Sequence, residues 1–239
     1  MTRPVVGIGE LLWDVFPDGR KVAGGAPFNF AFHCRQLGHA GTIVSRVGDD
    51  DLGRALREEV RRLGLTDEFI QTDPDHPTGT VRVALDDAGV PSYTITEGVA
   101  WDYLGWNEPT ARLMFDAAAA CFGSLVQRAA SSRAAVRRFL ENAYGFVGAD
   151  KPLALFPWAA SEGGGLPRKV VVFDVNLRQQ FYDPETLRAS LRAANWCKLN
   201  DEELAVLVGM FGLDPATDSD ALDQLGRLDH AGKDTICLT

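Results

Sequence analysis

The chain has 239 residues, 46% of them hydrophobic, and its 24 basic and 33 acidic residues give a formal net charge of −9. That size and apolar content suffice for one domain core, and the acidic balance disfavours nucleic acid and anionic membranes as partners. No apolar run approaches the roughly 20 residues that span a bilayer, and the first residues show no targeting pattern, so we expect a cytoplasmic protein.

The first elements alternate between strand and helix. Short apolar runs over 5–9 and 42–47 are typical of buried strands, and apolar periodicity over 28–37 and 51–63 is typical of helices. Asp51 is available as the N-cap of the second helix. This β-α-β-α order predicts a mainly parallel sheet covered by helices on both faces.

Two stretches interrupt this order. Range 78–96 alternates on both sides of a turn that contains Gly89, which predicts a β-hairpin, and range 11–22 contains another turn. Hairpins inserted into an α/β chain usually stand off the main body, so we expect a small separate group of strands here.

The alternation then resumes. We expect helices over 109–118, 131–142, 184–194, 201–208 and 218–228, and strands over 120–123, 170–175, 196–199 and 235–238. Range 144–168, with three prolines and three consecutive glycines, is interpreted as a surface insertion into one domain that spans 1–239. A partner-binding flap and a disordered segment are both open alternatives for it.

The four cysteines are widely spread, and none belongs to a C-x-x-C pair. Each lies in or beside an apolar segment. We therefore expect four reduced, buried thiols rather than disulfides or a zinc site.

A glycine turn leads into the first predicted helix. Gly24 and Gly25 let backbone approach a ligand closely, and Pro27 suits the first turn of a helix. Asn29 follows near the helix N-terminus, where backbone N–H groups and an amide could meet a small polar ligand. A plain glycine turn that leads into a buried helix explains the same residues.

Polar residues follow other predicted strands. Asp14 comes after the first strand, and a carboxylate there can accept two hydroxyl hydrogen bonds, although a solvated loop aspartate is the alternative. Asn176 and Arg178 close the strand over 170–175, where Asn suits hydroxyls and Arg suits planar anions. A capped turn with an exposed arginine is the alternative there.

A third polar group lies at 198–203. Asn200 and Glu203 lie three apart and share a helix face. An acidic face near a polyphosphate suits Mg²⁺ held through water. The same spacing is also a capping box, with Asn at the N-cap and Glu three residues later, and both interpretations can hold together.

Together with Gly9-Glu10 and the run Val47-Gly48-Asp49-Asp50-Asp51-Leu52-Gly53, the stretch Gly-Gly-Ala-Pro-Phe-Asn-Phe-Ala resembles the ribokinase-like (PfkB) carbohydrate kinases, and the fructokinase branch in particular. The resemblance implies a three-layer α/β sandwich with a small β-lid formed by strands from about 11–22 and 78–96. It implies ATP-dependent phosphorylation of a small sugar, with fructose favoured, with ATP and Mg²⁺ as cofactors and with a homodimer formed through the lid.

The resemblance also assigns roles. Asp14, Gly24, Gly25, Asn29, Asn176 and Arg178 would bind the sugar; Lys198, Asn200 and Glu203 would bind the nucleotide, with Glu203 reaching the metal through water. The D-x-N-x-R pattern at 174–178 also occurs in 2-keto-3-deoxygluconate kinases. Leu12 stands where the ribose-preferring branch often carries Asn, which disfavours ribose.

The family's second signature, D-T-x-G-A-G-D, supplies an anion hole and the base. It does not occur between residue 1 and Thr239. The expectation is therefore a C-terminally truncated fold without a catalytic base in this chain, one that binds sugar weakly and does not phosphorylate it. Two alternatives to a fructokinase stay open: a 2-keto-3-deoxygluconate kinase, and a non-catalytic module that binds a sugar or a partner.

Overall fold

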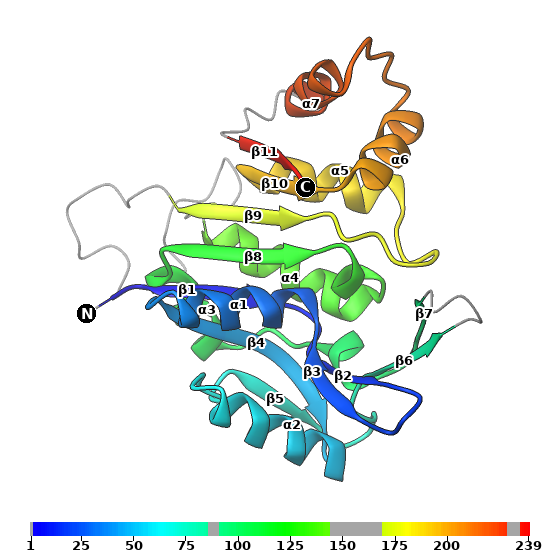
Figure 1. Ribbon diagram of the computed structural model, residues 1–239. Helices are drawn as coiled ribbons and strands as arrows, with labels where there is room; N and C mark the ends of the chain where they lie inside the picture. Colours follow the sequence, from blue (N-terminus) through cyan, green and yellow to red (C-terminus); the bar gives the residue numbers. More distant parts are fainter. Residues whose placement is uncertain (1, 86–90, 144–168, 229–234) are drawn as a thin grey trace, which may run out of the picture.

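The computed structural model describes residues 2–85, 91–143, 169–228 and 235–239, and the strands in these ranges form two sheets (Figure 1). The larger sheet has seven strands in the order β11-β10-β9-β8-β1-β4-β5, and all of its pairings are parallel. Its strands are β1 (Pro4–Ile8), β4 (Ala40–Gly48), β5 (Ile70–Asp73), β8 (Ala119–Gly123), β9 (Val170–Asp174), β10 (Trp196–Leu199) and β11 (Thr235–Leu238).

The small sheet has four strands in the order β3-β2-β6-β7: β2 (Leu12–Val15), β3 (Lys21–Gly24), β6 (Thr80–Leu85) and β7 (Pro91–Ile95). The pairs β2–β3 and β6–β7 are antiparallel, whereas β2 and β6 are parallel. Figure 1 shows this sheet projecting from the main body beyond the carboxyl ends of β1 and β4. The two predicted hairpins are thus joined side by side, while the predicted turn at Gly89 lies outside the described residues.

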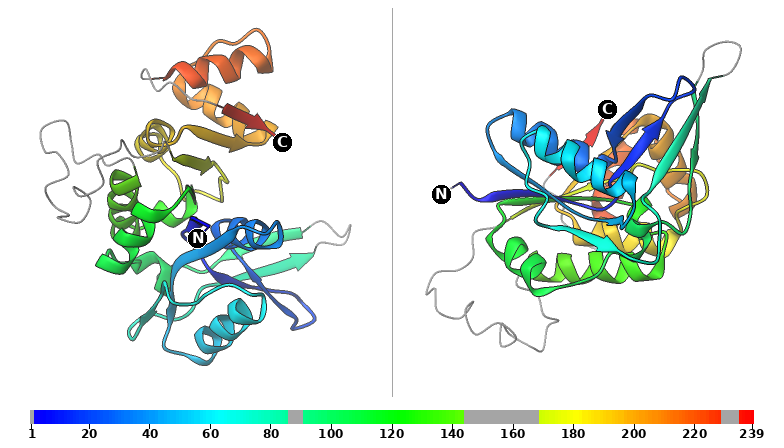
Figure 2. Two further views of the ribbon diagram at one scale, coloured as in Figure 1. Left: turned by 90° about the vertical axis from the view of Figure 1, so that its left-hand side faces the viewer. Right: turned by 90° about the horizontal axis from the view of Figure 1, so that it is seen from below.

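Helices cover both faces of the larger sheet, with α1 and α2 on one face and α3 and α4 on the other (Figure 2). The helices are α1 (Ala26–Gln36), α2 (Asp51–Arg62), α3 (Glu108–Asp116), α4 (Ala130–Ala143), α5 (Pro184–Ala193), α6 (Asp201–Phe211) and α7 (Asp218–Arg227). Two short 3-10 helices, η1 (Ala100–Tyr103) and η2 (Leu125–Gln127), lie between them in the chain.

Burial on both faces explains why the strands were visible in the sequence. One core cluster packs α3, α4 and α5 against the sheet and includes Phe122, Phe139 and Phe173. A second packs Phe28 of α1 and Leu56 of α2 against the opposite face. A parallel sheet covered on both faces needs nearly continuous apolar strands, and the predicted apolar runs are these strands.

Two local predictions need correction. The N-cap of α2 is Asp50, not Asp51, because the Asp50 carboxylate accepts the backbone N–H of Gly53 while Asp51 already lies inside the helix. Strand β5 was not predicted, since it is a four-residue edge strand with three polar residues and carries no apolar pattern.

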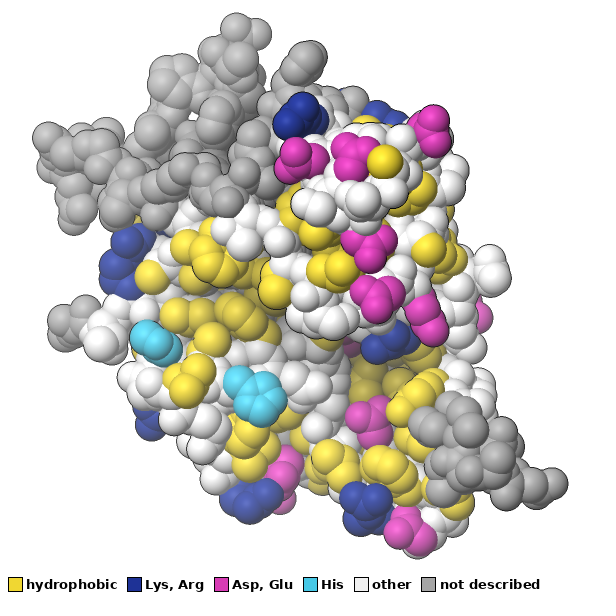
Figure 3. Space-filling view, turned by 45° about the horizontal axis from the view of Figure 1, so that its top comes forward, with side chains coloured by type: hydrophobic (Ala, Val, Ile, Leu, Met, Phe, Trp, Pro, Cys, Tyr) yellow, Lys and Arg dark blue, Asp and Glu magenta, His cyan; other side chains and the backbone are white. Residues whose placement is uncertain are grey.

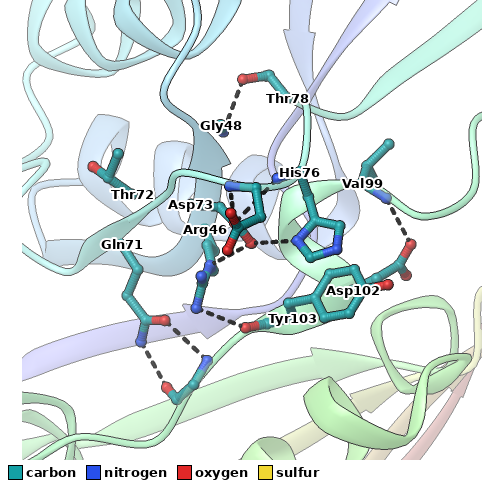
Figure 4. A network of polar contacts seen from close by, with 12 residues as sticks. Arg46, Gly48, Gln71, Thr72, Asp73, His76, Thr78, Val99, Asp102 and Tyr103 are labelled. Carbon is teal, nitrogen blue, oxygen red and sulfur yellow. Dashed lines mark hydrogen bonds and ion pairs between the residues drawn. The ribbon is translucent and has the colours of Figure 1, made fainter.

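A polar network fixes the connection between β5 and the small sheet (Figure 4). Arg46 Nε lies 2.8 Å from the buried Asp73 carboxylate, and Arg46 Nη1 donates to the Tyr103 carbonyl at 3.0 Å. His76 Nδ1 lies 3.1 Å from the same carboxylate, and its ring stacks on Tyr103 with centroids 3.5 Å apart. Thr78 then accepts the Gly48 N–H at 3.0 Å, immediately before β6 begins.

The four cysteines are free thiols, as predicted, but they are not all buried. Cys121 and Cys197 are buried and Cys34 is half-buried, whereas Cys237 is exposed because it lies on the outermost strand β11. The predicted insertion over 144–168 lies outside the described residues. Among the described helices, none combines the length and apolar character required to cross a membrane.

Candidate functional site

Polar residues follow neighbouring strands at one edge of the larger sheet. Glu10 follows β1, Ser124 follows β8, Asp174 ends β9 with Asn176 just beyond it, and Asn200 follows β10. The strands are adjacent and parallel, so their carboxyl ends meet at this edge. Ligands of open α/β sheets bind beyond these ends, which makes this edge the candidate site.

Two glycines let three segments meet closely at this edge. A Cβ on Gly24 would lie 2.3 Å from Asp14 Oδ2, and a Cβ on Gly25 would lie 2.2 Å from the Glu10 carbonyl oxygen. Gly25 also has φ +113°, which side chains other than glycine rarely adopt. Gly24 therefore leaves room for the Asp14 carboxylate, and Gly25 allows α1 to begin against the end of β1.

Asp14 lies within β2 of the small sheet rather than in a loop after the first strand of the main sheet. It pairs with Val22 of β3. Burial raises the pKa of its carboxyl, and no hydrogen bond or charge from the described residues offsets that cost. Its carboxylate thus lies in the small sheet against Gly24, with no hydrogen bond to the described residues.

Glu10 is the functional candidate that sequence reasoning did not name as a binding residue. Its side chain is 1% exposed; Oε1 accepts the Ala26 N–H at 3.2 Å, and Oε2 has no partner in the described structure. Burial raises the pKa of Glu10 to about 7; Asp174 adds to the rise, while backbone hydrogen bonds and Arg178 oppose it. The sequence held two signals for it: its position directly after a predicted buried strand, and the pair Gly9-Glu10 in the family resemblance.

Opposite charges gather around Asp174. Lys198 Nζ lies 3.3 Å from Asp174 Oδ1. Burial nevertheless raises the pKa of Asp174, while Lys198 and Arg178 lower it. Arg178 is exposed, and its side chain bonds only its neighbouring Leu177 carbonyl, at 3.2 Å, among the contacts of the described residues.

Asn176 is placed by its backbone. It is buried, has φ 40°, and its carbonyl accepts the Ser124 hydroxyl at 3.2 Å. A positive φ is tolerated by Asn better than by most residues. This turn directs the chain from β9 toward Arg178.

The capping box at the start of α6 is present. Asn200 Oδ1 accepts the Glu203 N–H at 2.8 Å, and Glu203 Oε2 accepts the Asn200 N–H at 2.9 Å. Glu203 Oε1 also accepts the Leu177 N–H at 2.9 Å, so the buried carboxylate ties α6 to the segment after β9. Each oxygen keeps one lone pair, so the residue still fits a hydrogen bond to a metal-bound water.

Gly24 thus lies against Asp14 and the adjacent Gly25 lies against Glu10, while Asp174 and Arg178 act on Glu10 through their charges. Asn29 lies in the first turns of α1, is exposed, and donates its backbone N–H to the Gly25 carbonyl at 2.9 Å. No cluster of three or more metal-ligating side chains occurs within the described ranges. The arrangement offers acceptors and donors for hydroxyl groups, with the exposed guanidinium group of Arg178 beside them.

Comparison with known proteins matches residues 15–134 to the family described as pfkB family carbohydrate kinase. Among curated proteins, the chain is 27% identical to a putative sugar kinase of Pyrococcus horikoshii over 219 residues, covering 85% of this chain and 63% of that protein. It is 29% identical to a fructokinase of Klebsiella pneumoniae over 214 residues, covering 84% of this chain and 62% of that protein. The chain therefore spans just over three fifths of these relatives.

Solved structures show the same fold. The structure of a fructokinase from Xylella fastidiosa superposes with a TM-score of 0.76 at 22% identity, over 100% of this chain and 70% of that one. The structure of the Pyrococcus horikoshii sugar kinase gives a TM-score of 0.70 at 26% identity, over 88% and 67%. The predicted ribokinase-like α/β fold with its mainly parallel sheet is confirmed.

Proposed function

Because the chain belongs to the pfkB family of carbohydrate kinases, we propose that it binds a small sugar for ATP-dependent phosphorylation, with fructose as the favoured substrate. Fructokinases recur among its relatives. The observation that carries the proposal is the half-buried Asp14 carboxylate, which lies against Gly24 with no partner from the described residues to offset its burial. A sugar with adjacent hydroxyl groups supplies the donors that this carboxylate lacks.

The other residues would surround the sugar. Asn29 would add an amide near the start of α1, and Gly24 and Gly25 would allow the sugar to approach the backbone. Asn176 and Arg178 would bind it from the segment after β9. A sugar held by several fixed hydrogen bonds presents one hydroxyl group in a fixed place, which is the main requirement of phosphoryl transfer.

The nucleotide would lie beyond β10. Lys198 would place a positive charge beside the phosphates, and Asn200 and Glu203 would hold the start of α6 in position. Mg²⁺ would neutralise phosphate charge, and the lone pairs left on Glu203 suit a hydrogen bond to one of its waters.

The test is sugar binding by calorimetry to this chain and to its Asp14→Asn variant. Asp14→Asn removes the charge but keeps the shape, so fructose affinity should fall about tenfold to a hundredfold, as expected for a hydrogen bond to a charged group. Asp18→Asn is the matched control, because Asp18 lies in the turn between β2 and β3 with its side chain 66% exposed. Equal affinity in wild type and Asp14→Asn would contradict the assignment.

The same measurement distinguishes the second substrate. If 2-keto-3-deoxygluconate is the ligand, its carboxylate should pair with Arg178, so Arg178→Ala should weaken its binding far more than that of fructose. Binding of fructose alone, weakened by Asp14→Asn, supports the first assignment.

A further inference from the structure

Arg128 occupies a buried position between the two sheets. It follows η2, and its side chain is 6% exposed. Its Nε and Nη2 each lie 2.8 Å from one oxygen of Asp102, whose side chain is 5% exposed. Planar, two-point pairing of this kind fixes the direction of the guanidinium group as well as its place.

The same guanidinium reaches two further segments. Nη2 donates to the Thr96 carbonyl at 2.6 Å, directly after β7 of the small sheet. The group also lies over the Trp101 ring, 4.0 Å from its centroid, and over the Phe181 ring, 4.6 Å from its centroid. Phe181 belongs to segment 177–183, and its N–H donates to the Arg178 carbonyl at 3.1 Å.

Apolar packing joins the same segments. One core cluster contains Leu12, Val81 and Ile95 of the small sheet together with Trp101, and Phe181 packs against it. Gln179 Nε2 also donates weakly to the Tyr93 carbonyl of β7, at 3.5 Å. The small sheet and segment 177–183 therefore share one packed junction, and Arg128 is its charged centre.

We propose that Arg128 is a positioning residue that couples the small sheet to segment 177–183, so that the placement of Asp14 and the placement of Arg178 depend on each other. This coupling rests on the proposed function, because Asp14 and Arg178 are the residues assigned to the sugar. Arg128 itself bonds Asp102 and Thr96 rather than the candidate site. Replacing it would leave the Asp102 charge buried without its partner, which loosens both segments at once.

Amide hydrogen exchange tests the coupling without any ligand. Arg128→Lys keeps the positive charge but loses the two-point pairing with Asp102 and the planar stacking on the aromatic rings. We expect exchange to become about tenfold faster both in the amides that pair β6 with β7 and in segment 177–183, and to stay unchanged in those that pair β1 with β4. Faster exchange in only one of the two segments, or equally throughout the chain, would overturn the proposal.

A second test variant and a control variant accompany this measurement. Phe181→Leu removes one stacked ring but stays apolar, and it should produce the same paired pattern if Arg128→Lys fails to fold. Arg57→Lys is the matched control: Arg57 is a partly buried arginine that lies 3.3 Å from Asp67, far from the junction in the chain. Arg57→Lys should change amide hydrogen exchange only within α2 and β5.

A thermodynamic cycle on fructose affinity then connects the junction to the site. Arg128→Lys should weaken binding about tenfold in the wild-type background and clearly less in the Arg178→Ala background, because the part of its effect that passes through Arg178 is then absent. Additive effects would show that Arg128 does not act through Arg178. If the wild-type chain binds no sugar, the proposed function fails, and hydrogen exchange still decides the coupling.

Discussion

Glu10 is a buried acid with one unpaired oxygen beside the candidate site. Its Oε2 atom has no partner in the described structure, and Asp174 adds negative charge nearby. Burial without full hydrogen bonding favours the neutral carboxylic acid, because ionising it would cost desolvation. The Glu10 side chain therefore changes charge near neutral pH. A sugar bound against Asp14 would lie close to this change of charge.

The raised pKa of Glu10 predicts a pH-dependent stability. The pKa of Glu10 is about 7 in the folded protein against an ordinary value of 4.5, so the stability that the protonated form contributes is complete below pH 4.5 and is lost as pH rises through 7. The loss in the free energy of unfolding amounts to about 3 kcal/mol at most. Urea unfolding at pH 5 and pH 8 should show a smaller difference in Glu10→Gln than in wild type.

Glu58→Gln is the control for this prediction, since Glu58 is exposed on α2. It should leave the pH dependence unchanged. If Glu10→Gln retains the full wild-type difference, the charge change must belong to another group, for example Asp174, whose pKa burial also raises.

At the scale of the element, α6 begins with a carboxylate that serves two segments. Glu203 accepts N–H groups from Asn200 in its own cap and from Leu177 after β9. The first contact stabilises the helix end, and the second holds the turn that carries Arg178. A single buried side chain thus places the start of α6 relative to the end of β9.

Removing this carboxylate should destabilise the fold more than removing an ordinary cap. Glu203→Ala leaves two partly buried N–H groups unpaired and should cost about 2–4 kcal/mol, whereas Asn200→Ala should cost about 1 kcal/mol. Glu202→Ala is the matched control, because Glu202 is exposed on the same helix. Urea unfolding that gives Glu203→Ala and Glu202→Ala equal stability would contradict the structural role.

On the scale of the whole molecule, the larger sheet is not equally covered along its width. Trp196 of β10 is 42% exposed, its register partner Val172 on β9 is half-buried, and Cys237 on β11 is exposed. Figure 3 shows hydrophobic side chains grouped on the molecular surface beside the acidic side chains around α6 and α7. Exposed apolar groups next to an outer strand favour association between chains.

We therefore expect concentration-dependent association that Trp196→Arg reduces, measured by light scattering. The charged side chain removes apolar area and adds repulsion at the same place. Leu37→Arg is the control: Leu37 is 77% exposed but lies at the end of α1, so its replacement should matter less. A wild-type chain that stays monomeric at all concentrations would reject this expectation.

The elements visible in the sequence were those with strong local signals. Apolar runs buried on both faces identified β1, β4 and β9, and Pro27 marked the start of α1. Strand β5 was missed because its four residues pair on one side only and show no apolar run. The predicted N-cap of α2 was one residue away from the observed one, because three consecutive aspartates, 49–51, offer the same side chain.

By itself, the sequence determined the parallel α/β class and supplied the residues proposed here for a sugar and a nucleotide, because periodicity, glycine and caps act over a few neighbouring residues. Only the tertiary structure decided that Asp14 lies against Gly24, that Glu10 is buried with one oxygen unpaired among the described residues, and that Arg128 joins segments 32 and 53 residues away in the chain, at Thr96 and Phe181. Burial and charge depend on what packs nearby in space, and long-range packing leaves no local pattern in the sequence.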